Sequence, residues 1–561
     1  MHRPPEPPAE QMGRLLGLAL QQHQAGQLAA AERLYRRILA ADPRHADTLH
    51  LLGVLAHQTG RFDLALDLIR QAILAAPAAP LLHANLGNVL ESLGRPDDAA
   101  ASHRHSIELD PAFAEGHKHL GTLLFEQGRL DAAEASLRQA LELRPDYHDA
   151  RNNLASVLFC QNRMEEAADC YRVLLAADPD DAQTHLNLGA ALLALERLDD
   201  AVAACRQAVA LRPDWTLALT RLGTAHMRLA DPAEAIACFR GVTRLEPDNP
   251  EAHVDLGLAL LRAGDMAAGW QEFEWRWRTR PFLETGRPYP RPQWRGEAAA
   301  GQTLLIHTEQ GFGDMLQFCR YAPLAHDRGL RVIVEAPAPL LRLLRSLRGV
   351  ATLMTGGDPL PPFDLHCPML SLPLAFGTTL ADVPAEVPYL SASPEEAAAF
   401  AARLAGHGAD GLRVGIAWAG NPEPEFDDRR SIAPDLLAPL WTIPGLVFVC
   451  LQEAGFSRPA GLPLIDLMDG ITDFAATAAL IANLHLVVSA DTAVVHLAGA
   501  LGKPVWLLNR FDNCWRWMTG RDDSPWYPAL RSFRQPRPGD WTSVMADVAS
   551  ALRALAAKGT P

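Results

Sequence analysis

The sequence predicts an α-solenoid of eight helical repeats followed by an α/β region built from two lobes. Two observations lead to this prediction. Prolines recur every 34 residues in the first half of the chain, at positions 43, 77, 111, 145, 179, 213, 247 and 281. After about residue 284 the period ends, and apolar runs of strand length alternate with helical patterns. A period of this length is typical of stacked helix pairs, and strand–helix alternation is typical of parallel sheets.

The composition is that of a folded protein. The 561 residues are 48% hydrophobic and 21% charged, and the formal net charge is -15. Partners with many phosphates require a basic surface, so we expect no nucleic-acid binding. The charge balance does not exclude a local basic pocket for a smaller anion.

The cysteines and the apolar runs predict a cytoplasmic protein. Eight cysteines are scattered without a CxxC pair, which indicates neither a disulfide framework nor a zinc site. The N-terminal residues lack the basic start and apolar core of a signal peptide. No uncharged run of about 18 apolar residues occurs, so we expect no membrane span.

Each repeat between residues 12 and 283 reads as a helix, a turn and a second helix. Glycine recurs at the turn, where a helix ends in a left-handed residue: Gly26, Gly60, Gly94, Gly128 and Gly264. Small residues recur at two further positions, which predicts close helix contacts: Gly53, Gly87, Gly121, Gly189, Gly223 and Gly257 at one, and Ala31, Ala65, Ala99, Ala133, Ala167, Ala201 and Ala235 at the other. Stacked pairs of this kind form a superhelix with a groove.

The eighth repeat differs from the others. Gly269 replaces the usual alanine, and the second helix contains Trp270, Trp275 and Trp277. A terminal repeat must bury its last face, so we expect these tryptophans to dock onto the following domain.

Polar residues recur at one position of the repeats and form a column along the array. In repeats three to eight the residue before the recurrent leucine is Asn85, His119, Asn153, Asn187, Arg221 and Asp255. One interpretation is a solvated helix face. The other is that the amides of Asn85, Asn153 and Asn187, which both donate and accept, hold the backbone of an extended peptide acceptor.

The second half predicts two parallel sheets. Apolar runs at 303–308 and 331–336 belong to a first lobe, 284–395, and runs at 412–420, 446–452 and 484–489 belong to a second, 396–561. Ligands of such sheets bind beyond the carboxyl ends of the strands, here in the cleft between the lobes.

The segment SADTAVVHLAGALGKP, 489–504, is the strongest chemical signal. It brings Asp491, Thr492 and Ala493 from the end of a strand to the start of a helix, where free N–H groups favour a diphosphate. His496 follows Thr492 by four residues and can face the same side. The alternative is a plain helix cap with a packed histidine.

Two further clusters follow strand ends. Arg429 and Arg430, with Asn421 and Ser431 beside them, could bind phosphate, or the arginines could pair with Asp427 and Asp428. The EQGFGD turn, 309–314, contains Gly311, Gly313 and Asp314; this carboxylate could accept a proton from a hydroxyl or cap a helix. Gln452, Trp515 and Arg516 complete the predicted donor contacts, and core packing is the alternative for Trp515.

The repeats resemble the tetratricopeptide repeat family, and the polar column resembles the asparagine ladder of the repeat domain of O-linked N-acetylglucosamine transferase. Residues of roughly 300–555 resemble the metal-independent transferases of glycosyltransferase family nine, the heptosyltransferase group, which have the two-lobed GT-B fold. That resemblance implies a base at Asp314, preceded by Gly313, and a basic residue for the diphosphate at Arg430. The Asp-Thr-Gly-x-x-His segment of the family reads Asp491 to His496 here, with Ala493 in place of the glycine.

The resemblance therefore implies a glycosyltransferase, hexosyltransferase or heptosyltransferase-like, that moves a sugar from a nucleotide-diphosphate donor to an acceptor. It implies catalytic roles for Asp314, Arg430 and His496, and neither a metal nor a cofactor besides the donor. The repeats suggest a protein or peptide acceptor in their groove. The alternatives are a non-catalytic repeat scaffold for protein interactions and a transferase for a cell-surface glycan.

Overall fold

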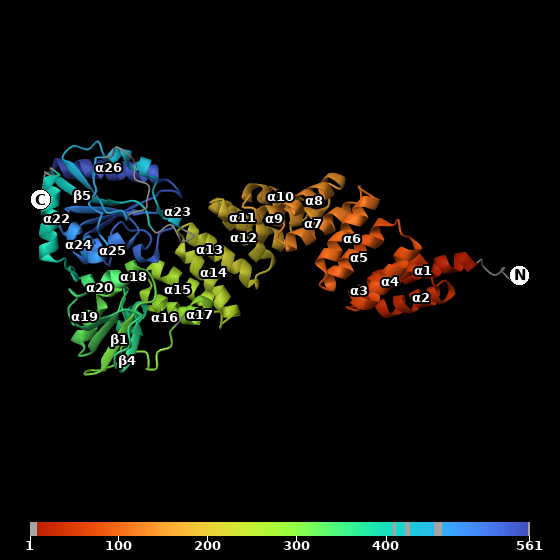
Figure 1. Ribbon diagram of the computed structural model, residues 1–561, viewed down its shortest axis with the longest axis horizontal. Coiled ribbons are helices and arrows are strands. Elements are labelled where there is room, and N and C mark those ends of the chain that lie inside the picture. The colour runs from red at the N-terminus through yellow and green to blue at the C-terminus, as the bar shows by residue number, and fades with distance from the viewer. Residues whose placement is uncertain (1–7, 286, 408–410, 421–426, 454–462, 559–561) are drawn as a thin grey trace. The chain divides into compact units, whose positions relative to one another are not determined.

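The computed structural model describes residues 8–285, 287–407, 411–420, 427–453 and 463–558. The chain divides into two compact units, 1–213 and 214–561. The first unit contains repeats one to six, and the second contains repeats seven and eight together with both α/β lobes (Figure 1). The predicted fold class, a helical-repeat solenoid followed by an α/β region of two lobes, is confirmed.

Repeats one to six are six pairs of helices. Their bounds are α1 Pro8–Gln24, α2 Leu28–Ala41, α3 Ala46–Gln58, α4 Phe62–Ala75, α5 Pro80–Ser92, α6 Pro96–Leu109, α7 Ala114–Glu126, α8 Leu130–Leu143, α9 His148–Cys160, α10 Met164–Ala177, α11 Ala182–Ala194 and α12 Leu198–Leu211. The recurrent alanines, such as Ala31, Ala65 and Ala99, are fully buried between the helices.

The proline that recurs every 34 residues lies in the loop between two repeats, and the first helix of the next repeat contacts this loop. The side chain six positions after the proline donates a hydrogen bond to the proline carbonyl: His83 to Pro77 at 2.9 Å, His117 to Pro111 at 3.2 Å, Arg151 to Pro145 at 2.6 Å, His185 to Pro179 at 2.9 Å and His253 to Pro247 at 2.9 Å. Because proline has no N–H, its carbonyl is its only backbone hydrogen-bonding group. The hydrogen bond from the side chain to this carbonyl therefore holds the loop against the next helix.

Repeats seven and eight lead into the lobes. Their helices are α13 Thr216–Arg228, α14 Pro232–Leu245, α15 Pro250–Ala263 and α16 Met266–Phe273, followed by the 3₁₀ helix η1 Glu274–Arg278 and by α17 Arg280–Thr285. The expected docking of the terminal tryptophans is confirmed for Trp270, whose ring lies edge-on to those of Phe318 and Trp515, at 6.0 and 5.2 Å between centroids.

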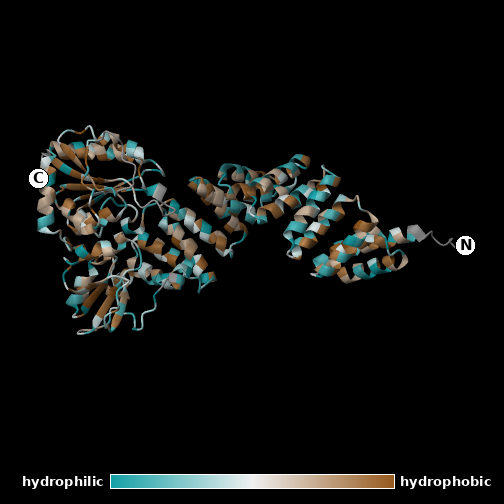
Figure 2. Cartoon of the chain, viewed as in Figure 1, coloured by the Kyte–Doolittle hydropathy of each residue, from teal (hydrophilic) through white to brown (hydrophobic). Residues whose placement is uncertain are grey.

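The first lobe is built on a four-stranded parallel sheet in the order β3-β2-β1-β4. The strands are β1 Thr303–His307, β2 Arg331–Glu335, β3 Val350–Met354 and β4 Leu365–Pro368, and the helices are α18 Phe312–Phe318, α19 Tyr321–Asp327, α20 Ala338–Leu344, η2 Met369–Ser371 and α21 Leu372–Phe376. The buried strands are strongly hydrophobic (Figure 2), as expected of a parallel sheet.

The second lobe is built on a six-stranded parallel sheet in the order β10-β9-β8-β5-β6-β7. The strands are β5 Leu412–Ala417, β6 Leu446–Cys450, β7 Leu464–Ile465, β8 Leu486–Ala490, β9 Val505–Asn509 and β10 Leu530–Arg534. The helices are α22 Pro394–Gly406, α23 Asp427–Arg430, η3 Pro434–Leu440, α24 Phe474–Ala482, α25 Ala493–Ala500, η4 Trp515–Trp517 and α26 Trp541–Ala557.

One hydrophobic core joins repeat eight to both lobes. It includes Trp270 of α16, Phe318 of α18, and Trp526 of the second lobe. The guanidinium of Arg320 fastens the lobes further, because it donates to the carbonyls of Pro384 and Trp526, both at 2.8 Å. The two lobes and the last repeats therefore form one packed body around the candidate site.

Candidate active site between the two lobes

A cavity of about 1050 Å³ lies between the lobes. The first lobe contributes the turn after β1, and the second contributes the residues that follow β5, β6, β8 and β9. Ten of the thirteen predicted catalytic and donor-binding residues that the structure describes line it: Gly311, Gly313, Asp314, Arg430, Gln452, Asp491, Thr492, Ala493, His496 and Arg516. Segments about 200 residues apart thus meet because strand ends of the two sheets face one another.

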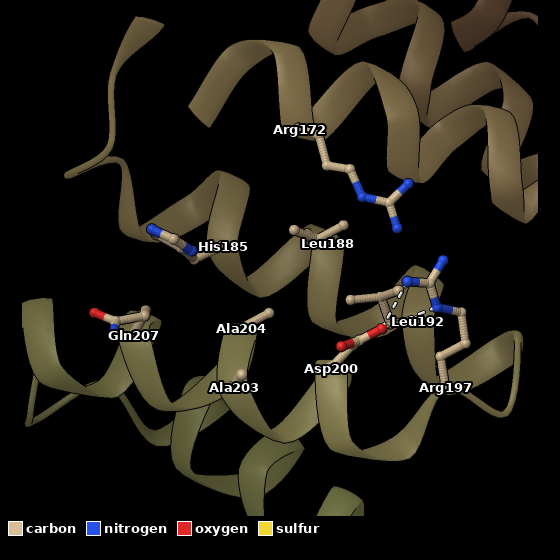
Figure 3. A pocket seen from close by; sticks show the side chains of 9 residues that line it. All are labelled: Arg172, His185, Leu188, Leu192, Arg197, Asp200, Ala203, Ala204 and Gln207. Carbon is tan, nitrogen blue, oxygen red and sulfur yellow. Dashed lines mark hydrogen bonds and ion pairs between the residues drawn. The ribbon is translucent and has the colours of Figure 1, made fainter. Parts of the chain in front are cut away.

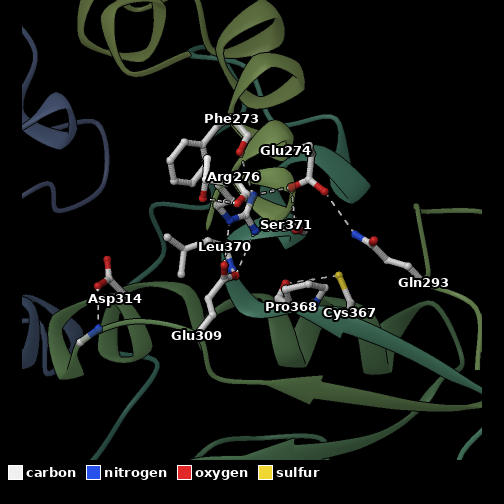
Figure 4. A network of polar contacts seen from close by, with 12 residues as sticks. Phe273, Glu274, Arg276, Gln293, Glu309, Asp314, Cys367, Pro368, Leu370 and Ser371 are labelled. Atoms are coloured by element: carbon white, nitrogen blue, oxygen red, sulfur yellow. Dashed lines mark hydrogen bonds and ion pairs between the residues drawn. The ribbon is translucent and has the colours of Figure 1, made fainter. Parts of the chain in front are cut away.

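The turn of residues 309–314 is held from the last repeat. Arg276 of η1, only 1% exposed, donates to both carboxylate oxygens of Glu309, at 2.7 and 3.0 Å (Figure 4). Glu309 also accepts from the backbone N–H of Leu370 at 2.9 Å. This buried pair is satisfied on several sides, so it fixes where the turn begins.

Asp314 is both a helix cap and one half of an ion pair between the lobes. Its Oδ2 accepts from the N–H of Gly311 at 3.1 Å at the start of α18 (Figure 4), and its Oδ1 pairs with Arg516 of the second lobe. A carboxylate has about four lone-pair positions, so these two contacts leave acceptor capacity toward the cavity. The capping alternative is thus present and is compatible with a proton-accepting role.

Arg516 is buried and remains charged. It donates from Nε to Gln317 Oε1 at 2.7 Å, and its guanidinium lies 4.3 Å from the centre of the Trp515 ring. Burial alone would lower the pKa of Arg516, but Asp314, Cys514 and Asp491 together outweigh it, so that this pKa is raised. The cavity therefore has a fixed cation beside the candidate base.

The helix α25 starts at the cavity. Thr492 is its N-cap and accepts from the N–H of Val494 at 3.3 Å, while its hydroxyl lies 3.2 Å from that of Ser489. Thr492, Ala493 and Val494 line the cavity, so the first turn presents its N–H groups at the site where an anion would bind.

His496 is a neutral imidazole packed under the cavity. It is 5% exposed, and its Nδ1 lies 3.0 Å from the hydroxyl of Tyr527. Burial, with the nearby charges of Arg516 and Arg320, lowers the pKa of His496 well below its usual value. Gly313 lies against this ring, because a Cβ added there would be 3.0 Å from His496 Cδ2. The glycine thus allows α18 and α25 to approach.

Gln452 shapes the end of β5. Its side-chain oxygen accepts from the N–H groups of Trp418 and Ala419, at 3.0 and 2.9 Å, and its amide donates to the Ala419 carbonyl at 3.1 Å. The side chain lines the cavity wall while its polar atoms hold the backbone that leads to Gly420.

Three predicted donor contacts are not among the residues that line the cavity. Trp515 is not among the residues that line the cavity, and it packs between Trp270 and Phe318 in the shared core. Arg429 does not line the cavity either, and its Nη1 donates to Asp512 at 2.9 Å. The Ser431 hydroxyl accepts from the N–H of Gly420, a residue of the cavity wall, at 3.2 Å. The predicted contact at Asn421 lies outside the described residues.

Arg510 is a cavity residue that the sequence analysis missed. It follows directly after β9, which pairs with β8, so it lies on the same sheet edge as Asp491. The sequence signal, an arginine after the apolar run VWLLN, becomes informative once β9 is known to lie beside β8.

The cavity also has an apolar side. Phe312 of α18 is 40% exposed, and its ring lies 5.2 Å from that of Phe474 at the start of α24. Pro339, Met468 and Ile471 extend this wall. An arginine-bearing wall beside an apolar one suits a ligand that has both a charged and a weakly polar part.

The three asparagines of the polar column are half-buried in the first unit. The Asn85 amide lies 2.6 Å from His50 Nε2, Asn153 donates to Thr122 Oγ1 at 2.7 Å, and Asn187 accepts from Gln183 at 3.0 Å. A separate groove of about 350 Å³ lies in repeats five and six, where Arg172, His185 and Arg197 contribute to its lining (Figure 3). Asn187 is not among its lining residues.

Among the described residues, no cluster of three or more His, Cys, Asp and Glu side chains has a geometry that could hold a metal ion. None of the described helices is long and apolar enough to cross a membrane.

Sequence profiles match segments in both halves of the chain. Tetratricopeptide repeat profiles match residues 22–89, 82–115, 119–182, 169–214 and 220–274. The profile of glycosyltransferase family 9 (heptosyltransferase) matches residues 465–508, which include β8, α25 and all but the last residue of β9. The chain therefore contains tetratricopeptide repeats followed by a segment, residues 465–508, that is similar to family 9 glycosyltransferases.

Individual relatives cover parts of the chain. Protein FlbA of Caulobacter vibrioides is 28% identical over 325 residues, which are 52% of this chain and 52% of that protein. The chain thus spans about half the length of the curated relative it matches.

Two solved repeat proteins are similar to it. The tetratricopeptide repeat protein TTC0263 of Thermus thermophilus is 25% identical and covers 32% of this chain and 99% of its own, with a TM-score of 0.30. MamA of Desulfovibrio magneticus is 24% identical and covers 30% and 97%, also with a TM-score of 0.30.

Proposed function

We propose that this tetratricopeptide repeat protein, with its family 9 glycosyltransferase segment, is a glycosyltransferase that uses a nucleotide-diphosphate sugar as donor. The observation that carries the proposal is the interlobe cavity, which brings Asp314, Arg430, Arg516 and the start of α25 together beside an apolar wall. This combination suits a ligand with a nucleoside, a diphosphate and a sugar. The two-lobed arrangement is that expected of the GT-B fold.

In the proposed reaction, an acceptor hydroxyl attacks the anomeric carbon of the donor sugar. The bond between that carbon and the diphosphate oxygen breaks, and the nucleoside diphosphate leaves with the electron pair. Asp314 accepts the hydroxyl proton, and the ion pair with Arg516 holds the Asp314 carboxylate in place. Arg430 and the N–H groups at the start of α25 stabilise the charge on the leaving group, so that no metal is needed for this role.

His496 has a supporting role in this proposal. Because its imidazole is neutral and bonded to Tyr527, it does not add charge to the cavity. From α25, its ring lies against Gly313 of α18. We therefore place it as a positioning residue, which differs from the catalytic role that the family resemblance implied.

The acceptor is proposed to be a protein whose extended segment binds the groove of the repeats. The support is the fusion of tetratricopeptide repeats, a protein-binding module, to the transferase segment, together with the half-buried amides of Asn85, Asn153 and Asn187. A triple Asn→Ala variant should retain donor hydrolysis and lose transfer to protein. Equal transfer by this variant would exclude the asparagine column and leave a glycan acceptor as the alternative.

The direct test is turnover by the purified full-length protein with a panel of uridine, guanosine, adenosine and cytidine diphosphate sugars. We expect release of one nucleoside diphosphate, and we expect Asp314→Asn to lower kcat by about 10²–10⁴-fold, the usual contribution of a general base. Asp358→Asn is the matched control, because Asp358 also caps a backbone N–H three residues earlier, that of Thr355 at 2.7 Å, and does not line the cavity.

If the protein binds and consumes no donor of the panel, the non-catalytic scaffold is the better description. If Asp314→Asn and Asp358→Asn behave alike while the wild-type protein is active, the transferase assignment stands and Asp314 is not the base.

A further inference from the structure

A cluster of arginines around Asp512 connects repeat seven with the cavity. Asp512 lies in the loop between β9 and η4, and its side chain is 13% exposed. Its Oδ2 accepts from Arg429 Nη1 at 2.9 Å and lies 3.2 Å from Arg228 Nε, and its Oδ1 lies 3.2 Å from Arg510 Nε.

The three arginines come from three different parts of the second unit. Arg228 is the last residue of α13 in repeat seven, and Arg429 belongs to α23, next to the cavity residue Arg430. Arg510 follows β9 and itself lines the cavity. A single carboxylate therefore joins a repeat helix to two cavity segments.

A fourth arginine, Arg262, interacts with the charge of Asp512. Arg262 of α15 is 2% exposed and donates from Nη1 to the Met227 carbonyl at 2.6 Å. Burial lowers the pKa of Arg262 to about 10, while the charge of Asp512 acts in the opposite direction. A guanidinium at this pKa is still protonated at neutral pH. Arg510, which lines the cavity, places a positive charge where it would attract an anion.

We propose that Arg510 is a further diphosphate-binding residue of the donor site and that Asp512, held by Arg228 of repeat seven, positions it. The inference rests on the proposed function. The ion pair with Asp512, at 3.2 Å from Arg510 Nε, holds a guanidinium that lines the cavity, and a guanidinium can donate to two phosphate oxygens at once. Repeat seven is then part of the donor site, in addition to any role of the repeats in binding an acceptor.

The test is nucleotide binding by the full-length protein. Titration calorimetry with uridine, guanosine, adenosine and cytidine diphosphates identifies the preferred base, and the matching nucleoside and inorganic pyrophosphate separate the contributions of base and phosphate. We expect Arg510→Ala to weaken the binding of the diphosphate and of pyrophosphate by about tenfold or more, the usual loss for a charge-assisted hydrogen bond, and to leave nucleoside binding unchanged. Arg510→Lys should recover part of the loss.

Arg228→Ala tests the positioning role, since Arg228 does not line the cavity. It should weaken diphosphate and pyrophosphate binding by about three- to tenfold without affecting the nucleoside, and Arg228→Lys should restore most of it. The matched control is Arg244→Ala, an exposed arginine at the end of the other helix of repeat seven, which should bind as wild type. Thermal unfolding of each variant checks that the fold is retained.

The outcomes separate the two proposals. If the wild-type protein binds no nucleotide, the proposed function fails and this inference fails with it. If the wild type binds and both Arg510→Ala and Arg228→Ala bind as tightly, the inference is wrong and the proposed function stands. Equal loss of nucleoside and diphosphate affinity in Arg228→Ala would indicate a structural role and would also overturn the positioning claim.

Discussion

At the scale of the single residue, burial decides which charge a side chain carries. His307, at the end of β1, is 4% exposed, and its Nε2 lies 3.2 Å from His366 Nδ1. Burial, helped by His366 and by nearby arginines, lowers the pKa of His307 to about 3. The protein therefore keeps a neutral imidazole where free histidine would begin to protonate near pH 6.5.

This predicts acid sensitivity. Below pH 6.5 the unfolded chain binds a proton at His307 and the folded chain does not until about pH 3, so the free energy of unfolding falls as the pH is lowered through this window. At pH 4.5 the loss is about 2–3 kcal/mol. Urea unfolding at pH 7 and 4.5 should show a smaller loss for His307→Gln than for wild type.

The control is His407→Gln, which removes an exposed histidine of the same unit. It should follow the wild-type pH dependence. A His307→Gln variant with the full wild-type loss would show that the histidine is protonated in the folded state.

The cavity residues show how far single residues could be predicted. Asp314, Asp491 and Thr492 follow strand ends in the sequence, so their meeting at one edge could be expected. The burial of Trp515 could not, because an aromatic side chain has the same sequence signal in a core and beside a ligand. Its place depends on Trp270, about 245 residues earlier, and only the packing of repeat eight decides it.

At the scale of the element, the turn inside each repeat is the most regular feature. The glycines predicted there have positive φ, between 70° and 91°. In repeats five, six and seven the same position holds Asn162, Glu196 and Ala230, with φ of 62°, 59° and 57°. The repeat geometry thus imposes a left-handed residue even where the sequence does not supply glycine.

This position predicts a stabilising substitution. A left-handed alanine costs about 1 kcal/mol, so Ala230→Gly should raise the free energy of unfolding by about that amount. The reverse change, Gly128→Ala, should lower it, because Gly128 has φ of +72° and no atom within 4 Å of an added Cβ, so that backbone strain alone is measured. Chemical denaturation followed by circular dichroism measures both, and a stability decrease in Ala230→Gly would contradict the prediction.

The sequence predicts the central strands of each sheet better than the edge strands β3 and β7, because the two kinds of strand differ in burial. Central strands such as β1, β5 and β8 are almost fully buried and appear as continuous apolar runs. β3 and β7 lie at sheet edges and are half-exposed, so their sequences lack such a run. Their existence follows from pairing with β2 and β6, which the sequence does not display.

At the scale of the whole molecule, the division into units differs from the division by sequence period. The 34-residue period extends through repeat eight, whereas the compact second unit already begins at Asp214. The reason lies in the side chains that repeats seven and eight send into the lobes: Arg228, Trp270 and Arg276.

A truncation pair tests this division. A chain of residues 214–561 should fold cooperatively and bind the nucleoside diphosphate as tightly as the full protein. A chain of residues 284–561 loses the partners of Glu309, Phe318 and Asp512, and we expect it to be insoluble or to unfold at much lower temperature. Thermal unfolding and calorimetry distinguish the two, and full binding by the shorter chain would show that the lobes do not need the repeats.

The sequence by itself determined the helical repeats, their turns, the two parallel sheets and the strand-end segments that supply the cavity. These features depend on local periodicity and on short-range backbone chemistry, which each segment carries within itself. Only the tertiary structure decided that Trp515 and Arg429 lie outside the cavity lining and that Arg510 belongs to it. It also decided that Arg276 of repeat eight holds the turn at Glu309 and that Arg228 of repeat seven holds the loop at Asp512. Those facts depend on contacts between residues that are tens to hundreds of positions apart, and no local pattern encodes which of several chemically similar side chains will be enclosed.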